Sequence, residues 1–214
     1  MKLIITSGFT TVVLVFLAVL QANAAVVGGY TFADGAFVNQ LVSSNGSFLN
    51  YNSATSSNVI STSQLSADLT DRSAGTYVLS MSPNAYVDLA FGSTNVVNGA
   101  GNDLAFFFAG SATFSVNLSG QTQSFSTMDT GYTVRDSFGT YSLAVALVDL
   151  SGFGLAQNAS LGTFRVMLNN SSPALSLVGS FNTQNTPNNP VPVPAPLILL
   201  FSGLAALGLV SRRK

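Results

Sequence analysis

In the middle of the chain, between residues 25 and 186, two six-residue runs contain only apolar residues, and this restricts the folds that this part can adopt. Residues 104–109 read LAFFFA and residues 143–148 read LAVALV. Each run has the length of a strand rather than a helix, and Asp or Gly lies next to it. Successive side chains of a strand point to opposite faces, so a strand that is apolar on both faces needs packed layers on both sides. We therefore expect both runs to be central strands of a layered β fold.

Several other segments alternate apolar and polar residues, which indicates strands with one buried face. In residues 113–118 (TFSVNL) and 163–168 (TFRVML) every second residue is apolar. Ser82-Pro83-Asn84 separates two more such segments and predicts a hairpin turn between them. The predicted strands of this group are residues 77–81, 85–91, 113–118, 163–168 and 174–181.

The part of the chain between residues 25 and 186 shows no long apolar period of 3.6 residues. Residues 45–62 are rich in Ser, Asn and Thr and predict a loop or a weak edge region. Short strands with frequent turn signals predict an all-β fold, here a single antiparallel β sandwich over residues 25–186. With 16 Phe and no Cys, its core must be held by burial without disulfides.

The composition excludes several classes of function. The chain has no His and no Cys, so it cannot form a Ser-His-Asp triad, a thiolate nucleophile or a zinc site with nitrogen or sulfur ligands. The formal net charge is −1, and charged residues make up 7% of the chain. There is thus no basic field of the kind that binds nucleic acid.

The N-terminal segment has the three parts of a secretory signal peptide. Lys2 precedes the apolar residues 12–20, and a small-x-small site, Ala22-Asn23-Ala24, comes before Ala25. The alternative, an N-terminal membrane anchor, would need about 20 apolar residues to span a bilayer. We expect residues 1–24 to be a signal peptide that signal peptidase removes after Ala24.

The C-terminal segment combines a Pro-rich stretch, a short apolar run and a basic end. Residues 188–196 contain four of the seven prolines, residues 197–210 are mostly apolar, and Arg212, Arg213 and Lys214 end the chain. The apolar run is short against the ~20 residues of a stable span. A basic cluster stays on the cytoplasmic side of a membrane. Taken alone, these features predict a weak tail anchor.

These three features in this order resemble the PEP-CTERM sorting signal of Gram-negative bacteria. Val191-Pro192-Val193-Pro194-Ala195 is most similar to the variant whose motif reads Val-Pro-Leu-Pro-Ala. The resemblance implies that an exosortase recognises the chain, cleaves it near Pro192, Pro194 and Ala195, and transfers it to the cell surface or an extracellular polymer. The apolar helix would anchor the chain to the inner membrane only transiently. Residues 187–214 are then a stalk followed by the sorting signal.

Residues 77–110 have a second resemblance, to a core module of many PEP-CTERM exported proteins. In that module a Gly-x-Gly-Asn-Asp turn leads into a strand, and residues 99–103 read GAGND. The resemblance implies a jelly roll similar to galactose-binding-like domains. Such folds host both ligand binding and scaffolding, so the fold alone does not assign a function.

Oxygen-bearing side chains near the predicted turns are candidate Ca²⁺ ligands, because Ca²⁺ prefers carboxylate and carbonyl oxygens. One set is Asn98, Asn102 and Asp103, and another is Asp68 with Asp71. The alternative is that these residues close turns by bonding to nearby backbone. Neither set has the spacing of an EF-hand loop.

Three functions remain open. The first is an exported, non-enzymatic surface or extracellular-matrix protein without a cofactor. The second is a carbohydrate-binding module that attaches to exopolysaccharide, with a structural Ca²⁺; its sugar platform would use Tyr30, Tyr51, Tyr132 and Tyr141. The third is a glycan hydrolase with two Asp residues as acid and base, although no Asp pair has a defined separation.

Overall fold

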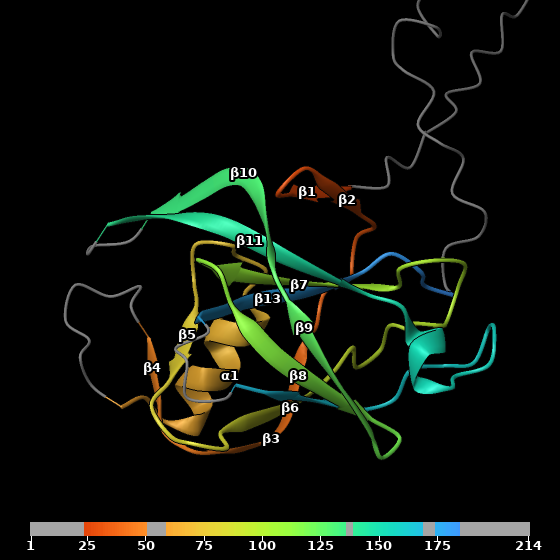
Figure 1. Ribbon diagram of the computed structural model, residues 1–214, viewed down its shortest axis with the longest axis horizontal. Helices are drawn as coiled ribbons and strands as arrows, with labels where there is room; N and C mark the ends of the chain where they lie inside the picture. The colour runs from red at the N-terminus through yellow and green to blue at the C-terminus, as the bar shows by residue number, and fades with distance from the viewer. Residues whose placement is uncertain (1–23, 51–58, 136–138, 169–173, 185–214) are drawn as a thin grey trace, which may run out of the picture.

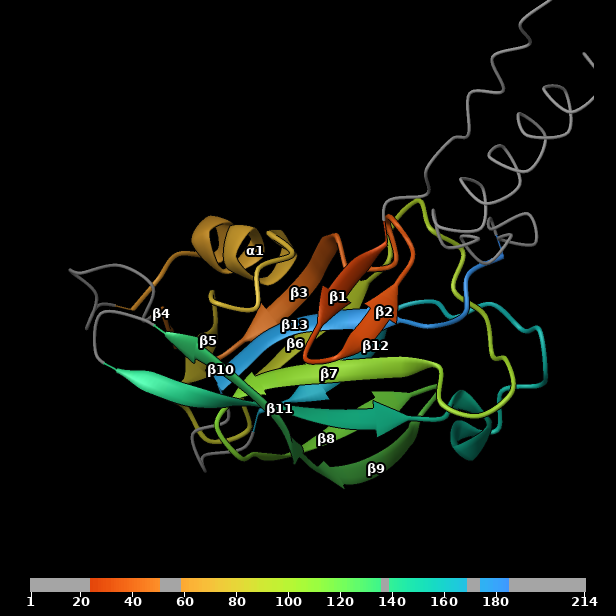
Figure 2. The same ribbon diagram turned by 90° about the horizontal axis from the view of Figure 1, so that it is seen from above.

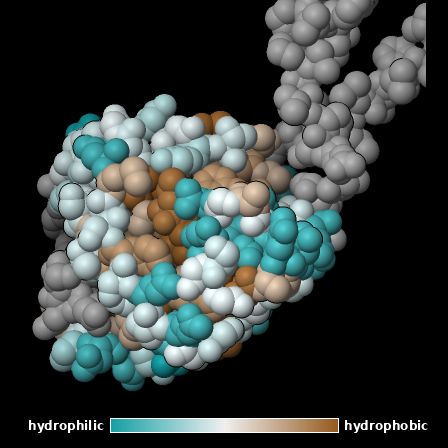
Figure 3. All heavy atoms as spheres, turned by 45° about the vertical axis from the view of Figure 1, so that its right-hand side comes forward, coloured by the Kyte–Doolittle hydropathy of each residue, from teal (hydrophilic) through white to brown (hydrophobic). Residues whose placement is uncertain are grey.

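The structure is a computed structural model that describes residues 24–50, 59–135, 139–168 and 174–184 (Figure 1). These residues form three antiparallel sheets and a single α-helix. The all-β prediction is therefore confirmed at this level. Figure 3 shows one face of the molecule, on which hydrophilic residues surround a strip of hydrophobic ones.

The two larger sheets carry most of the strands. In spatial order the six-stranded sheet consists of β10 (Met128–Arg135), β11 (Thr140–Val148), β7 (Leu104–Ala109), β13 (Ala174–Ser180), β5 (Val78–Ser80) and β4 (Phe48–Asn50). The five-stranded sheet consists of β3 (Gln40–Asn45), β6 (Tyr86–Ala90), β12 (Phe164–Met167), β8 (Thr113–Leu118) and β9 (Gln121–Ser126). β1 (Ala25–Val27) and β2 (Tyr30–Phe32) form a separate pair, called here the N-terminal ribbon.

The strands pair in a nested order. β8 pairs with β9, β7 with β11, β6 with β12 and β5 with β13, all antiparallel. The inner pair β8–β9 and the pair β6–β12 belong to the five-stranded sheet, and the other two pairs belong to the six-stranded sheet. The chain therefore has the strand order of one long hairpin that is folded over, so that successive strand pairs belong alternately to the five-stranded and the six-stranded sheet.

The main core lies between the two sheets. Phe106 and Phe108 of β7 contact Phe114 of β8, with ring centroids 5.2 Å and 4.7 Å apart. Phe106 also meets Phe164 of β12 edge-on at 5.9 Å. These contacts join strands of different sheets, so the sheets pack face to face as in a sandwich. The alternating segments 113–118 and 163–168 turn their apolar residues into this core, as predicted.

A second core covers the outer face of the six-stranded sheet. Phe107 of β7 points away from the main core and meets Phe32 of the N-terminal ribbon, with ring centroids 5.9 Å apart. Figure 2 shows the ribbon lying over β13 and β7. β7 therefore has packed layers on both faces, and so does β11, whose Val145 and Ala146 belong to different cores. This confirms the expectation that the apolar runs are central strands.

The helix α1 (Thr62–Thr70) was not predicted. Leu65 and Leu69, one turn apart, belong to the main core, and α1 contacts β3 of one sheet and β13, β4 and β5 of the other. Its apolar stripe contains only these two leucines, which is too short to register as a helical period. Residues 59–61, within the region expected to be a loop or a weak edge region, lead into this helix, which begins at Thr62. β4, at the start of the same Ser/Asn-rich region, is an edge strand.

The hairpin predicted around Ser82-Pro83-Asn84 is wrong. Its two flanking strands exist as β5 and β6, but they lie in different sheets and do not pair. The turn instead carries the chain from one sheet to the other. Residues 182–184, which follow the last described strand, are held by the domain, because Thr183 bridges to Val96 and the Gln184 amide donates to the Asn95 carbonyl at 2.8 Å.

The predicted processing sites lie mostly outside the described residues. This applies to Ala22 and to the whole C-terminal set, Pro192, Pro194, Ala195, Arg212, Arg213 and Lys214. Ala24 is exposed, and Ala25 begins β1 and is half-buried. Within the described ranges, no helix has the length and apolar character needed to cross a membrane.

Candidate functional site

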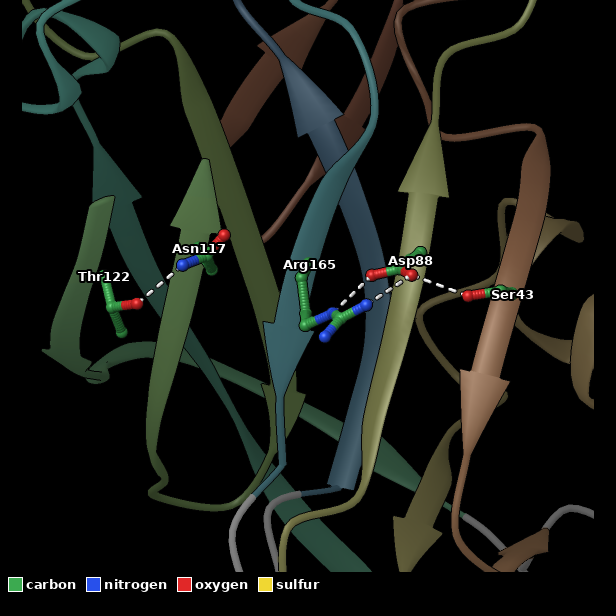
Figure 4. Close-up of polar contacts among 5 residues, drawn as sticks. All are labelled: Ser43, Asp88, Asn117, Thr122 and Arg165. Atoms are coloured by element: carbon green, nitrogen blue, oxygen red, sulfur yellow. Dashed lines mark hydrogen bonds and ion pairs between the residues drawn. The ribbon is translucent and has the colours of Figure 1, made fainter. Parts of the chain in front are cut away.

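The outer face of the five-stranded sheet carries a line of polar side chains that crosses all five strands. Each member lies directly opposite the next in the strand register, and Figure 4 shows the side chains on one surface. We call this line the polar row. It consists of Ser43 on β3, Asp88 on β6, Arg165 on β12, Asn117 on β8 and Thr122 on β9.

An ion pair with two hydrogen bonds lies within the polar row. Arg165 donates from Nε to Asp88 Oδ1 at 2.7 Å and from Nη2 to Asp88 Oδ2 at 2.9 Å. Ser43 Oγ donates to the same Oδ2 at 2.6 Å. The strand alternation creates this placement, because Phe164 and Val166, on either side of Arg165, point into the core. The Arg165 and Asp88 side chains remain 39% and 14% exposed.

The face of the Tyr86 ring also contacts the guanidinium of Arg165. The Arg165 Cζ atom lies 3.6 Å from the centroid of the Tyr86 ring, which is a cation–π contact. Tyr86 precedes Asp88 by two residues on β6, so both side chains share the outer face. The guanidinium is thus held by a carboxylate and a ring, while Nη1 has no hydrogen-bond partner among the described residues.

The ion pair shifts the pKa of both partners. Hydrogen bonds from Arg165 lower the pKa of Asp88 below its ordinary value of 3.8, against the opposing effect of burial. The same hydrogen bonds raise the pKa of Arg165. Both groups are therefore charged at neutral pH, and together they are neutral. The site presents donors and acceptors without a net charge.

The other half of the polar row borders a shallow hollow. Asn117 Nδ2 donates to Thr122 Oγ1 at 2.7 Å. The hollow has a volume of about 320 Å³ and is lined by Asp88, Asn117, Ser119, Thr163, Phe164 and Arg165. Pockets for apolar ligands are lined mainly by hydrophobic side chains. A lining of amide, hydroxyl and guanidinium groups instead suits a ligand rich in hydroxyl groups.

Asp103, a candidate Ca²⁺ ligand, is fully buried and bound by N–H groups. Its Oδ1 accepts from the Gly99 amide at 2.6 Å and from Asn182 Nδ2 at 2.8 Å, and its Oδ2 accepts from the Leu150 amide at 2.8 Å. The carboxylate thereby joins three loops at one end of the sandwich. These hydrogen bonds agree with the turn-closing interpretation at Asp103.

Asn98 and Asn102 do not share that arrangement. Asn98 is buried, and its Nδ2 donates to the Leu155 carbonyl at 2.7 Å, while its Oδ1 has no partner in the part of the chain that the structure describes. Asn102 is exposed. Ca²⁺ binding by Asn98, Asn102 and Asp103 stays a prediction.

Asp68 and Asp71 have separate structural surroundings. Asp68 is buried, and its two oxygens accept from Asn50 Nδ2 at 2.6 Å and Gln64 Nε2 at 2.8 Å. Burial raises the pKa of Asp68. Asp71 caps the C-terminal end of α1 and accepts from the Ser73 amide. Within the described ranges there is no group of three or more acidic residues that could hold a metal ion.

The tyrosines predicted to form a sugar platform divide into two groups. Tyr132 and Tyr141 are exposed, as expected. Tyr30 is half-buried, because its ring packs against Phe107 and Phe181 in the second core. Tyr30 is therefore not an exposed ring of the kind that a sugar platform needs, and Tyr51 lies outside the described residues.

The polar row was not predicted as a site. Alternation in residues 163–168 does place Arg165 opposite to the core, and residues 85–91 do the same for Asp88. The sequence signal for this site was thus a charged residue, Arg165 or Asp88, at an outward-facing position of each of these two strands. What the sequence lacks is the register that joins them, since the partners are 77 residues apart.

Comparison of the chain with protein-family models, with curated proteins and with solved structures found no match.

Proposed function

We propose that the chain is an exported, non-enzymatic protein whose β domain binds exopolysaccharide through the polar row. The observation that carries this proposal is the Arg165–Asp88 pair, held on an exposed sheet face beside a polar hollow. Sugars offer many hydroxyl groups, and a fixed array of donors and acceptors can bind them without reorganising. An electrically neutral site fits a hydroxyl-rich chain of either charge.

The fold class that we propose is a jelly roll similar to galactose-binding-like domains. The nested pairing from β8–β9 out to β5–β13 supports it, because a jelly roll consists of two four-stranded sheets with Greek-key connections. In this interpretation β3, β4 and β10 extend the two sheets at their edges. Such folds also serve as plain scaffolds, so the binding role depends on the polar row.

A purely structural role for the same pair makes a different prediction. Opposite charges on neighbouring strands stabilise a sheet by about 0.2–1 kcal/mol, with no ligand involved. In that case removing the Arg165 side chain lowers stability slightly and leaves ligand binding unchanged. The exposed pair Arg72–Asp34, with an Nη1–Oδ1 distance of 3.3 Å, provides a matched control elsewhere on the surface.

The experiment is a glycan array and affinity electrophoresis on the full-length chain and two variants, Arg165→Ala and Arg72→Ala. Both variants lose one arginine, so their net charges are equal. We expect saturable binding to at least one polysaccharide, weakened about tenfold or more by Arg165→Ala and unchanged by Arg72→Ala. Equal binding by both variants would refute the polar row as the site. Glycan turnover that a single Asp→Asn substitution abolishes would instead favour the hydrolase.

The route of export remains part of the proposal. The N-terminal pattern around Ala22, Ala24 and Ala25 supports removal by signal peptidase. The resemblance of residues 187–214 to a PEP-CTERM signal supports an exosortase as the second partner, with transient anchoring in the inner membrane followed by release to the surface or matrix. Nucleic acid is not a proposed partner.

A further inference from the structure

Two tyrosines on the other sheet are exposed on one face of the β10–β11 pair. Tyr132 is 56% exposed and Tyr141 is 37% exposed, whereas every other aromatic side chain in the described ranges is buried or half-buried. Tyr132 lies opposite Leu143, and Val134 lies opposite Tyr141. Directly opposite residues share a face, so the two tyrosines are diagonal neighbours on the face that carries the second core.

A β-bulge sets the register of Tyr132, so that it lies opposite Leu143. Asp129 lies opposite Ala144, and the next paired residue is Tyr132, opposite Leu143, so Thr130 and Gly131 are extra. Three hydrogen bonds hold the bulge: Gly131 N to Asp129 Oδ1, Thr130 Oγ1 to the Leu143 carbonyl, and Tyr132 N to Thr130 Oγ1. Gly131 has φ +78°, which other residues rarely adopt. Bulges are over-represented at sheet edges and next to active sites.

Neighbouring groups restrict both rings while leaving them accessible. The Tyr132 ring lies against the N-terminal ribbon, where a Cβ added to Gly29 would be 3.5 Å from Tyr132 Cε2. Tyr141 meets the buried Tyr77 edge-on, with ring centroids 6.0 Å apart and an interplanar angle of 74°. A ring that is already ordered loses little conformational freedom on binding.

We propose that Tyr132 and Tyr141 form a second carbohydrate-binding site, on which sugar rings of a polysaccharide stack by their C–H faces. The ligand class is taken from the proposed function, so the inference rests on it. Tyrosine suits this role because its ring is apolar and its hydroxyl group bonds to polar groups. The polar row lies on the outer face of the five-stranded sheet, and the tyrosines lie on the outer face of the six-stranded sheet. The domain is therefore bivalent and cross-links two polysaccharide chains.

The test compares binding with cross-linking for the full-length chain and its variants. Soluble alginate, xylan and mixed-linkage β-glucan serve as probes; affinity electrophoresis reports binding, and light scattering reports cross-linking. The variants are Tyr132→Ala/Tyr141→Ala, its control Tyr132→Phe/Tyr141→Phe, Arg165→Ala, and the combination of the alanine changes. Because the chain has no Trp, tyrosine emission gives an independent signal of contact at the rings.

We expect each single-site variant to bind a probe but to lose cross-linking, and the combined variant to lose binding. The phenylalanine control keeps both rings, so it should cross-link like the wild type. Loss of both rings should weaken binding at that site roughly tenfold. Retention of binding by both single-site variants, with loss of cross-linking in each, also excludes cross-linking through self-association of the chain.

The remaining outcomes separate this inference from the proposed function. If the tyrosine-to-alanine variant binds and cross-links like the wild type, or changes only the oligomeric state, the second site is refuted and the polar row stands. If that variant loses all binding while Arg165→Ala is unaffected, the tyrosine site stands and the polar row is refuted. The domain would then have only one binding site and would not be bivalent. Absence of binding to every probe by the wild type refutes both sites.

Discussion

Arg165 and Asp88 place opposite charges on a sheet face where hydroxyl and amide groups surround them. The guanidinium is planar and carries donors in a fixed arrangement, so the two hydrogen bonds to Asp88 and the contact with Tyr86 set its orientation completely. Lysine has neither property. The orientation of this side chain thus determines how its guanidinium N–H groups are directed on the face.

The same pair makes stability depend on pH. Because the folded protein lowers the pKa of Asp88 below 3.8, the carboxylate stabilises the fold fully above that value, and this stabilisation is lost as the pH falls through the lower, folded-state pKa. We expect Asp88→Asn to reduce the free energy of unfolding by about 0.5–1 kcal/mol at pH 7, since Arg165 is partly solvent-exposed. The difference from wild type should shrink below about pH 4.

Urea denaturation of both proteins between pH 3 and pH 7 measures this difference. Asp34→Asn is the control, since it removes the carboxylate of the more exposed Arg72–Asp34 pair and should change stability less. A difference between Asp88→Asn and wild type that grows on acidification would contradict the expected sign.

At the scale of elements, β13 joins the two cores. All seven of its residues are buried, although it contains Ser176, Gly179 and Ser180. Ser176 Oγ donates to the carbonyls of Ser73 and Ala74, so this buried hydroxyl group is satisfied. Gly179 has another purpose: an added Cβ would lie 2.7 Å from Phe32 Cε1. Phe32 of the N-terminal ribbon therefore packs directly against the backbone of Gly179.

Gly179→Ala should therefore displace Phe32 and loosen the N-terminal ribbon. We expect the substitution to lower the free energy of unfolding by about 1–3 kcal/mol. In a Phe32→Ala background the same substitution should have little effect, because the opposing ring is gone. Thermal or urea unfolding of the four proteins gives the coupling energy. Gly162→Ala is the control, since an added Cβ there meets nothing within 4 Å. A coupling energy near zero would show that Phe32 does not limit the space at Gly179.

The strands of the two central cores were largely predictable from the sequence because their apolar pattern is local, whereas their pairing and the edge strands β3, β9 and β10 were not. The segments 104–109 and 113–118 match β7 and β8 to the residue. The Pro-Asn turn after residue 81, however, has the same local sequence whether it joins two strands of one sheet or strands of two different sheets. The sheet to which each strand belongs is decided by its distant partner, β13 for β5 and β12 for β6. The polar row depends on the same distant register.

The helix α1 had a signal that its apolar pattern did not reveal. Ser61 is its N-cap and accepts from the Gln64 amide at 3.2 Å, and Ser-x-x-Gln is the spacing of a capping box. Leu65 and Leu69 then supply the one buried stripe. Capping chemistry was thus a better indicator of this short helix than periodicity.

At the scale of the whole molecule, the domain separates two proposed processing sites. Intact-mass measurement on protein from the native envelope or matrix tests both of them. We expect a chain that begins at Ala25 and ends near Pro192-x-Pro194-Ala195, because the short apolar run is poorly matched to a permanent membrane span. A chain that retains Lys214 would contradict exosortase processing and indicate a tail anchor.

Replacement of Arg212, Arg213 and Lys214 by Ser supplies the matched test of the basic end. The uncleaved precursor should accumulate or be mislocalised, because the cluster that fixes orientation is gone. Unchanged processing would show that the cluster is not part of the signal.

The nested strand order has a consequence for when the domain can fold. β13, the last strand of the described residues, lies between β7 and β5 in the middle of its sheet, so neither has its full set of neighbours until residues 174–180 arrive. Its pairing of Ala174 with Leu79 gives the domain a high contact order, and such topologies fold slowly. Nearly the whole domain must therefore leave the ribosome before the native state can form. A chain that stays unfolded during synthesis is in the form that a narrow translocation channel requires.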